Sequence, residues 1–161
     1  MDKFTHLDEN GSARMVDVTG KGETRREATA RGIVRMKSET ARLVEAGAVA
    51  KGDVIGTAKI AGIMAAKKTG DLIPMCHPLQ LTGVDLRFVL DVPAGSIEIE
   101  ATVKTVGRTG VEMEAMTAVS VAALTIYDMC KSADREITIC DTRLVRKSGG
   151  KSGTFSREPE R

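Results

Sequence analysis

The chain has 161 residues, enough for one domain with a buried core, and its 24 Lys and Arg against 22 Asp and Glu give a formal net charge of +2. This balance provides no strong field to recruit nucleic acid or a membrane surface, and aromatic residues at 2% offer few platforms for stacked bases. The first residues lack the apolar core of a signal peptide, and the longest apolar-rich run, residues 118–127, is too short to span a bilayer. We therefore expect a cytoplasmic protein that binds neither nucleic acid nor membrane.

The first predicted elements are a strand and a short helix. Residues 1–22 are polar and contain glycines, which favours a partly mobile segment with one short docked patch at 15–18. From residue 24 to 36 small or apolar residues fall on alternate positions, which predicts a strand with one buried face. Ser38 is the expected cap of a short helix that ends at Gly47.

A second helix is predicted from Asp53, its expected cap, to Lys68. Its large apolar residues predict a buried stripe made of Ile55, Ile60, Ile63 and Met64.

The remaining elements complete an α+β pattern. Residues 79–92 and 96–106 alternate around a Pro-Ala-Gly turn and predict a hairpin. A long helix at about 111–132 and a last strand at 136–145 follow. Apart from one extra helix, the order β-α-α-β-β-α-β is the split β-α-β pattern of ferredoxin-like folds, an antiparallel sheet with helices on one face. A single domain over residues 1–161 is expected.

The loop at 71–79 holds His77 between Pro74 and Pro78. Each proline fixes its own φ and disfavours helix at the residue before it, so Ile73 and His77 are expected to be extended. An imidazole on such a stiff loop suits acid–base or hydrogen-bonding chemistry, although the loop alone favours a histidine that only satisfies local backbone groups.

The long helix carries a stripe that is polar at both ends and apolar in the middle. Glu114 and Asp128 share it with Val121 and Leu124, and the two carboxylates are roughly 21 Å apart along the axis at 1.5 Å per residue. They cannot both contact one small substrate from one chain. Two such helices packed antiparallel about a two-fold axis could do so, which predicts a dimer with shared sites. The alternative is that Asp128 and Lys131 form only an exposed i,i+3 pair.

The glycine-rich tail, residues 147–161, is basic at its start. It fails as a phosphate-binding P-loop, because Val145 stands where that motif needs Gly. Its glycines and lysines could still close over an anion such as a triphosphate, and we expect substrate to order it in part. A solvated basic tail is the alternative.

Five motifs, in order and without insertion, resemble the signatures of the MoaC family. They are Met-Val-Asp-Val at 15–18, Ile-Pro-Met-Cys-His-Pro-Leu at 73–79, Thr-Gly-Val-Glu-Met-Glu-Ala at 109–115, Tyr-Asp-Met-Cys-Lys at 127–131 and Lys-Ser-Gly-Gly-Lys-Ser-Gly at 147–153. The resemblance runs from about Thr5 to Gly153. Met75 and Met116 replace an expected Leu, volume-conserving changes that should not alter chemistry.

The resemblance implies a lyase of molybdenum-cofactor biosynthesis. Such an enzyme rearranges a 3′,8-cyclised dihydro-GTP to cyclic pyranopterin monophosphate and releases pyrophosphate. It also implies a ferredoxin-like homohexamer, a trimer of dimers, with sites at the dimer interface. By position, Asp128 is the catalytic acid residue. The substrate site is lined by Met75, Cys76, His77, Met113 and Glu114, with Lys51, Lys131, Arg26, Glu112, Lys147 and Lys151 in or near it.

Repeated proton transfers need lysines whose pKa falls toward neutrality, so we assign Lys51 and Lys131 as acid and base, with Asp128 orienting Lys131. His77 and Glu114 would hold the rings, and Arg26, Lys147 and Lys151 would clamp the phosphates. No cofactor or protein-bound metal is expected, and whether Mg²⁺ accompanies the triphosphate stays open.

Three alternatives remain. One is a non-catalytic oligomer that binds nucleotides or anions, and another is a purely structural oligomer. The third is a metal site at Cys76, His77 and Cys130, although adjacent Cys and His are awkward ligands for one ion.

Overall fold

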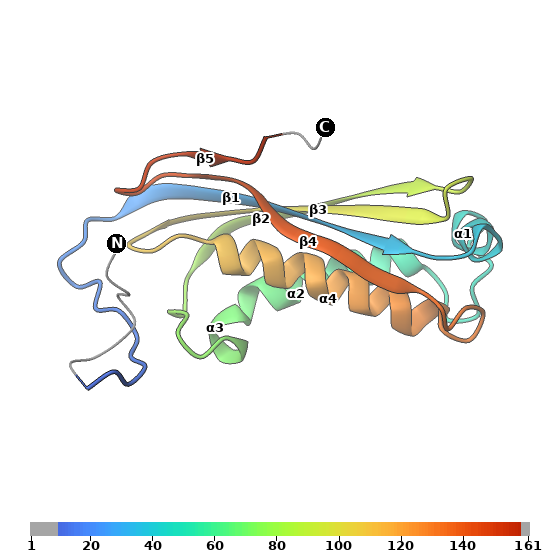
Figure 1. Cartoon of the computed structure of the whole chain (residues 1–161), viewed down its shortest axis with the longest axis horizontal. Coiled ribbons are helices and arrows are strands. Elements are labelled where there is room, and N and C mark those ends of the chain that lie inside the picture. Colours follow the sequence, from blue (N-terminus) through green and yellow to red (C-terminus); the bar gives the residue numbers. More distant parts are fainter. Residues whose placement is uncertain (1–9, 159–161) are drawn as a thin grey trace.

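The computed structural model describes residues 10–158, which form one antiparallel sheet with helices packed on one of its faces (Figure 1). In chain order the elements are β1 (Thr24–Arg35), α1 (Ser38–Glu45), α2 (Val54–Lys67), α3 (Thr69–Leu72), β2 (Leu81–Asp91), β3 (Ser96–Gly107), α4 (Glu112–Cys130), β4 (Thr138–Ser148) and β5 (Phe155–Ser156). The strand order is β2-β3-β1-β4-β5. The predicted ferredoxin-like α+β fold is confirmed, and α3 and β5 are elements that the sequence did not predict.

The central strand β1 packs closely against the long helix α4. Its alternate residues Ala28, Ala30 and Val34 are buried, as the alternation predicted. Between them lies Gly32, where an added Cβ would sit only 2.7 Å from Val119 Cγ1 of α4. The small residues of β1 therefore let α4 lie directly on the sheet.

Helix α2 packs with its small residues, which corrects the predicted stripe. Ile60 and Met64 are 62% and 53% exposed, whereas Gly62 is buried. A Cβ at Gly62 would lie 2.5 Å from Leu86 Cδ2 and 3.0 Å from the carbonyl oxygen of Ala118 on α4. Ile55 and Ile63 are partly buried against the core, as predicted, whereas the close approach of α2 and α4 at Gly62 leaves Ile60 and Met64 on the open side of the helix layer. The predicted cap is confirmed, since Asp53 Oδ1 accepts a hydrogen bond from Gly56 N at 2.9 Å.

The start of α1 is fastened by Asp134 rather than capped by Ser38. The Asp134 carboxylate is buried, and its Oδ2 accepts from the backbone N–H of Lys37 at 2.9 Å and from the hydroxyl of Thr40 at 3.3 Å. Its Oδ1 accepts from Glu136 N at 3.0 Å. The backbone donor of Lys37 is the main reason why the pKa of Asp134 lies below its usual value. Ser38 instead donates to the carbonyl oxygen of Pro93.

Helix α4 alone, among the described residues, is long and apolar enough to cross a membrane by length and composition. More than half of that helix is buried in the fold, where it packs against the sheet and against the neighbouring helix α2. This is the environment of a core helix, which passes the same test.

The open side of the helix layer carries large apolar side chains. Ile60 and Met64 of α2 and Leu124 of α4 are all more than half exposed. We call these three residues the helix-layer patch. Burying such side chains contributes about 1.5–3 kcal/mol each, so the patch favours association with another surface.

Candidate active site

A cavity of about 310 Å³ lies at the start of α4, and we call it the α4 pocket. Six residues predicted to bind substrate line it: Met75, Cys76, His77, Glu112, Met113 and Glu114. They come from two segments, the proline loop after α3 and the first turn of α4, which meet at one end of the fold (Figure 1).

The proline loop has the predicted stiffness. Ile73 is extended, with φ −106° and ψ 110°, as expected before Pro74. A turn then follows in which Cys76 N donates to Ile73 O at 3.0 Å. Gly70 lies against the loop, since a Cβ there would be 3.1 Å from Pro78 Cα. The loop is thus held against α3, and this places Cys76 and His77 in the pocket.

A segment near the N-terminus closes one side of the pocket. We call residues 15–21 the strap; it contributes Val16, Val18 and Lys21 to the lining. The ring Nε2 of His77 lies 2.8 Å from the carbonyl oxygen of Val16. Because a carbonyl only accepts, Nε2 carries the proton and Nδ1 remains to contact a ligand. Sequence reasoning noted a docked patch at 15–18 but did not place these residues in the site.

Glu114 lies on the floor of the α4 pocket and is only 4% exposed. Burial is the main cause of its raised pKa, and the charge of Glu112 adds to it. Burial likewise raises the pKa of the Cys76 thiol, with the Glu114 charge second. The Cys76 thiol therefore stays protonated. The carboxyl groups of Glu112 and Glu114 are the acceptors that the pocket offers to ring N–H donors.

At the opposite end of α4, two lysines meet on one carboxylate. Lys51, from the connection before α2, donates from Nζ to Asp128 Oδ2 at 2.7 Å and to the Asp128 carbonyl oxygen at 2.9 Å. Lys131 Nζ lies 2.8 Å from Asp128 Oδ1. We call these residues the lysine triad. Hydrogen bonds from Lys131 and then Lys51 lower the pKa of Asp128 to about 2.

For Lys131, the direction of the pKa shift is opposite to the lowering that was expected from neighbouring cations. The pKa of Lys131 is raised, because its hydrogen bond to Asp128 stabilises the ammonium form. Lys131 is therefore an ammonium group in this arrangement and cannot act as a base while Asp128 holds it.

The triad and the α4 pocket are separate within one chain. Asp128 follows Glu114 by fourteen residues of continuous helix, roughly 21 Å along the axis at 1.5 Å per residue. The structure therefore groups the residues of the α4 pocket and groups those of the lysine triad, but it does not bring the pocket and the triad together within one chain.

The expected phosphate-binding residues lie at the pocket end. Lys147, near the end of β4, donates to the hydroxyl of Ser152, and Lys151 is exposed in the turn that leads to β5. That strand pairs back on β4 through Phe155. Arg26 lies at the same end, and its guanidinium donates to the carbonyl oxygens of Gly107 and Arg108.

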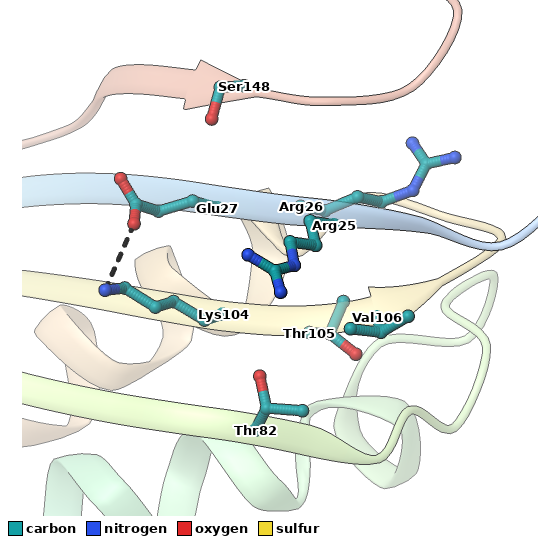
Figure 2. A pocket seen from close by; sticks show the side chains of 8 residues that line it. All are labelled: Arg25, Arg26, Glu27, Thr82, Lys104, Thr105, Val106 and Ser148. Atoms are coloured by element: carbon teal, nitrogen blue, oxygen red, sulfur yellow. Dashed lines mark ion pairs between the residues drawn. The ribbon is translucent and has the colours of Figure 1, made fainter.

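A larger cavity, of about 500 Å³, opens among strands at the same end of the sheet (Figure 2). It is lined by Arg25, Arg26, Glu27, Thr82, Lys104, Thr105, Val106 and Ser148. Glu27 neutralises Lys104 at 3.3 Å, and Arg26 is bonded to backbone carbonyls. Only Arg26 among the predicted site residues lines it, so the smaller α4 pocket is the better candidate site.

The metal alternative finds no support in the geometry. Cys76 and His77 line the α4 pocket, whereas Cys130 is buried at the last turn of α4, roughly 24 Å along the axis from Glu114. Residues 10–158 contain no group of three His, Cys, Asp or Glu side chains placed to hold a metal ion.

Comparison with known proteins gives one family. A model of the MoaC family matches residues 15–150. A cyclic pyranopterin monophosphate synthase of Heliobacterium modesticaldum is 65% identical over 98% of this chain and 99% of its own length. Relatives of the same name from Pelotomaculum thermopropionicum and a Roseiflexus species are 62% and 65% identical; the alignments cover 99% and 96% of this chain and 94% and 98% of the relatives. The chain therefore belongs to the MoaC family.

Proposed function

We propose that this protein is a cyclic pyranopterin monophosphate synthase, a lyase of molybdenum-cofactor biosynthesis. It would convert 3′,8-cyclo-7,8-dihydro-GTP into cyclic pyranopterin monophosphate with release of pyrophosphate. The observation that carries the proposal is the identity of 60–65%, over nearly the full length, with relatives of that name. The α4 pocket and the lysine triad support it by supplying ring-binding and proton-donating groups.

The α4 pocket is the proposed site for the purine-derived rings. Such rings present N–H donors, and Glu112 and Glu114 are matching acceptors in a partly buried setting. His77, held through Nε2 by the strap, offers Nδ1 as a further polar contact. Met75 and Met113 provide the apolar walls that a flat ring system packs against.

The lysine triad is the proposed centre of proton transfer. Lys131 is assigned as the general acid because it is an ammonium group in this arrangement, and Asp128 holds it in place until substrate enters. Lys51 reaches the same carboxylate from a different part of the chain. We assign it as the base, acting once bound substrate has separated it from Asp128. This convergence of Lys51 and Lys131 favours a reactive centre over an incidental helix pair.

The tail lysines are the proposed anchor for the triphosphate and for the leaving pyrophosphate. Lys147 and Lys151 lie at the pocket end, on a turn whose glycines expose backbone N–H groups. We assign no metal ligand to the chain. A Mg²⁺ ion bound by the triphosphate itself would need none.

A complete site requires two copies, and we propose a dimer in which two α4 helices run antiparallel. The helix-layer patch would then be buried between the copies, and the Asp128 end of one chain would lie beside the Glu114 end of the other. We extend this to a homohexamer, a trimer of such dimers, acting in the cytoplasm.

The experiment that tests shared sites is a mixing assay. Asp128→Ala and Glu114→Ala, each expected to be inactive, are co-refolded and supplied with the cyclised dihydro-GTP, and pyranopterin and pyrophosphate are measured. Random pairing makes half of the dimers mixed, each with one intact site of two, so activity should return to about a quarter of wild type.

The matched control mixes Asp128→Ala with Lys131→Ala, which damages the same triad in both chains and should restore nothing. No recovery in the first mixture, with mixed dimers shown to form, would mean that each site is built within one chain. Wild-type protein that binds GTP tightly but forms no product would instead support the non-catalytic anion-binding oligomer.

A further inference from the structure

Arg26 lies near the start of the central strand β1, and one edge of its guanidinium is hydrogen-bonded to the backbone. Its Nε donates to Gly107 O at 2.9 Å and its Nη2 donates to Arg108 O at 3.0 Å. The planar fork of an arginine fits two neighbouring carbonyl oxygens, which a lysine cannot reproduce. Arg26 therefore fixes the backbone just before the segment that begins α4 and lines the α4 pocket.

The glycine turn of the tail lies against the other side of the same guanidinium. A Cβ at Gly150 would lie 2.1 Å from Arg26 Nη1, and one at Gly149 would lie 2.1 Å from the carbonyl oxygen of Arg25. Both glycines have positive φ, 92° at Gly149 and 74° at Gly150. The turn that carries the tail lysines is thus seated directly on Arg26.

The loop that Arg26 holds also fastens the strap. Arg108 Nη1 donates to the carbonyl oxygen of Thr19 at 3.2 Å. The strap has its second attachment at Val16, through His77. Contacts therefore run without a break from the tail turn, through Arg26 and Arg108, to the strap that closes the α4 pocket.

We propose that Arg26 is a positioning residue rather than a phosphate ligand: it joins the tail turn to the Gly107–Arg108 loop and thereby holds the strap over the pocket. The importance of this for turnover rests on the proposed function. The positioning itself is a property of the protein alone and is testable without substrate.

The test is hydrogen exchange at the strap, where two amides report on closure. Thr19 N donates to Asp17 Oδ1 at 2.8 Å, and Lys21 N donates to Val18 O at 3.0 Å. In Arg26→Lys and Arg26→Met their exchange should accelerate roughly three- to tenfold, the effect of losing about one net hydrogen bond. The strand amides of β1 and β3 should exchange as in the wild type.

Arg25→Met is the matched control, since the neighbouring Arg25 side chain is exposed and, within residues 10–158, has no recorded hydrogen bond or ion pair. Its strap should exchange at the wild-type rate. Arg108→Met should loosen the strap as Arg26→Met does, and the double variant should add little, because both substitutions break one connection.

Kinetics separate the two roles of Arg26. A positioning role predicts that Arg26→Lys, which keeps the charge, fails to restore kcat/KM. Wild-type strap exchange in Arg26→Lys, or retained activity in that variant with a raised KM only in Arg26→Met, would overturn the proposal in favour of a phosphate contact. Because the exchange measurement needs no turnover, an inactive wild-type protein would count against the proposed function and not against this inference.

Discussion

Replacing Leu124 by Ala tests whether the open side of the helix layer is a subunit interface. Leu124 is 58% exposed in the single chain and lies between Glu114 and Asp128 in the sequence of α4. Fully burying a leucine contributes about 1.5–3 kcal/mol, so burying its exposed part contributes about 1–1.7 kcal/mol. A two-fold dimer contains two copies, and Ala keeps Cβ, which leaves a loss of about 2 kcal/mol. Dimer dissociation should become roughly thirtyfold easier.

The assay is sedimentation over a dilution series, combined with activity at each concentration. Leu124→Ala should dissociate at higher concentration than the wild type, and its specific activity should fall as it dissociates. Folding of the chain should be unaffected, because the side chain is largely in solvent within one copy. Leu43→Ala, an exposed leucine on α1 away from the patch, is the matched control.

One result would contradict the proposed interface. If Leu124→Ala associates and turns over as the wild type does at every concentration, the helix-layer patch is not the contact between copies. Loss of activity without any change in association would place Leu124 in contact with substrate instead.

Three further predictions concern packing and titration. Gly62→Ala should lower stability by about 1–2 kcal/mol in urea unfolding, because a Cβ meets the Ala118 carbonyl at 3.0 Å and overpacking outweighs the ~1 kcal/mol gain in helix propensity; an unchanged midpoint would contradict this close approach. Asp134→Asn should cost about 1–3 kcal/mol at pH 7, because it leaves buried donors unpaired. The native pKa of Asp134 is lowered, so its stabilisation is complete above the unfolded value of ~3.9 and is lost as the pH falls through the native pKa. The gap between wild type and variant should therefore narrow below about pH 4, and a gap that widens would contradict the assignment. Asp128→Asn removes the carboxylate that raises the pKa of Lys131, so the alkaline limb of the kcat/KM profile should move to lower pH; a limb that stays or rises would exclude Lys131 as the general acid.

The fold was predictable because local signals agree with one another along most of the chain. Alternation on β1 and β3, the cap at Asp53 and the prolines around His77 each act within a few residues. The start of α1 was not predictable in this way. Its carboxylate, Asp134, lies 94 residues beyond the Thr40 hydroxyl that it binds, and no local pattern marks such a partner.

The predicted stripe of α2 was correct for Ile55 and Ile63 but wrong for Ile60 and Met64, for a related reason. Large apolar residues usually face the core, and a stripe through Ile60 and Met64 follows that rule. Here the gap between α2 and α4 is set by Gly62 and its small neighbours, and only the tertiary approach of the two helices reveals this. The exposed Ile60 and Met64 then belong to a surface that one chain cannot bury.

The sequence predicted the parts of the candidate site that depend on side chains. It did not predict the parts that depend on backbone groups. His77 and Glu114 are conspicuous in the sequence, and they do line one pocket. The contacts of Val16 and Thr19 use carbonyl oxygens, which every residue has, so the sequence predicted a docked patch at 15–18 but not its place beside the pocket. Lys51 came only from the family resemblance, because its contact with Asp128 spans 77 residues.

The arrangement of α4 connects these observations. A single helix carries acceptor groups at one end and a proton-donating triad at the other, and its length keeps them roughly 21 Å apart. Within one chain, the two ends are too far apart to contact the same small substrate. The proposed antiparallel pair of α4 helices would remove that separation and would also bury Leu124, Ile60 and Met64, which are exposed in one chain. The proposed dimer thus accounts for both the apolar patch and the divided site: the contact that would stabilise the dimer would also assemble the site, so a monomer of this protein should be folded and inactive.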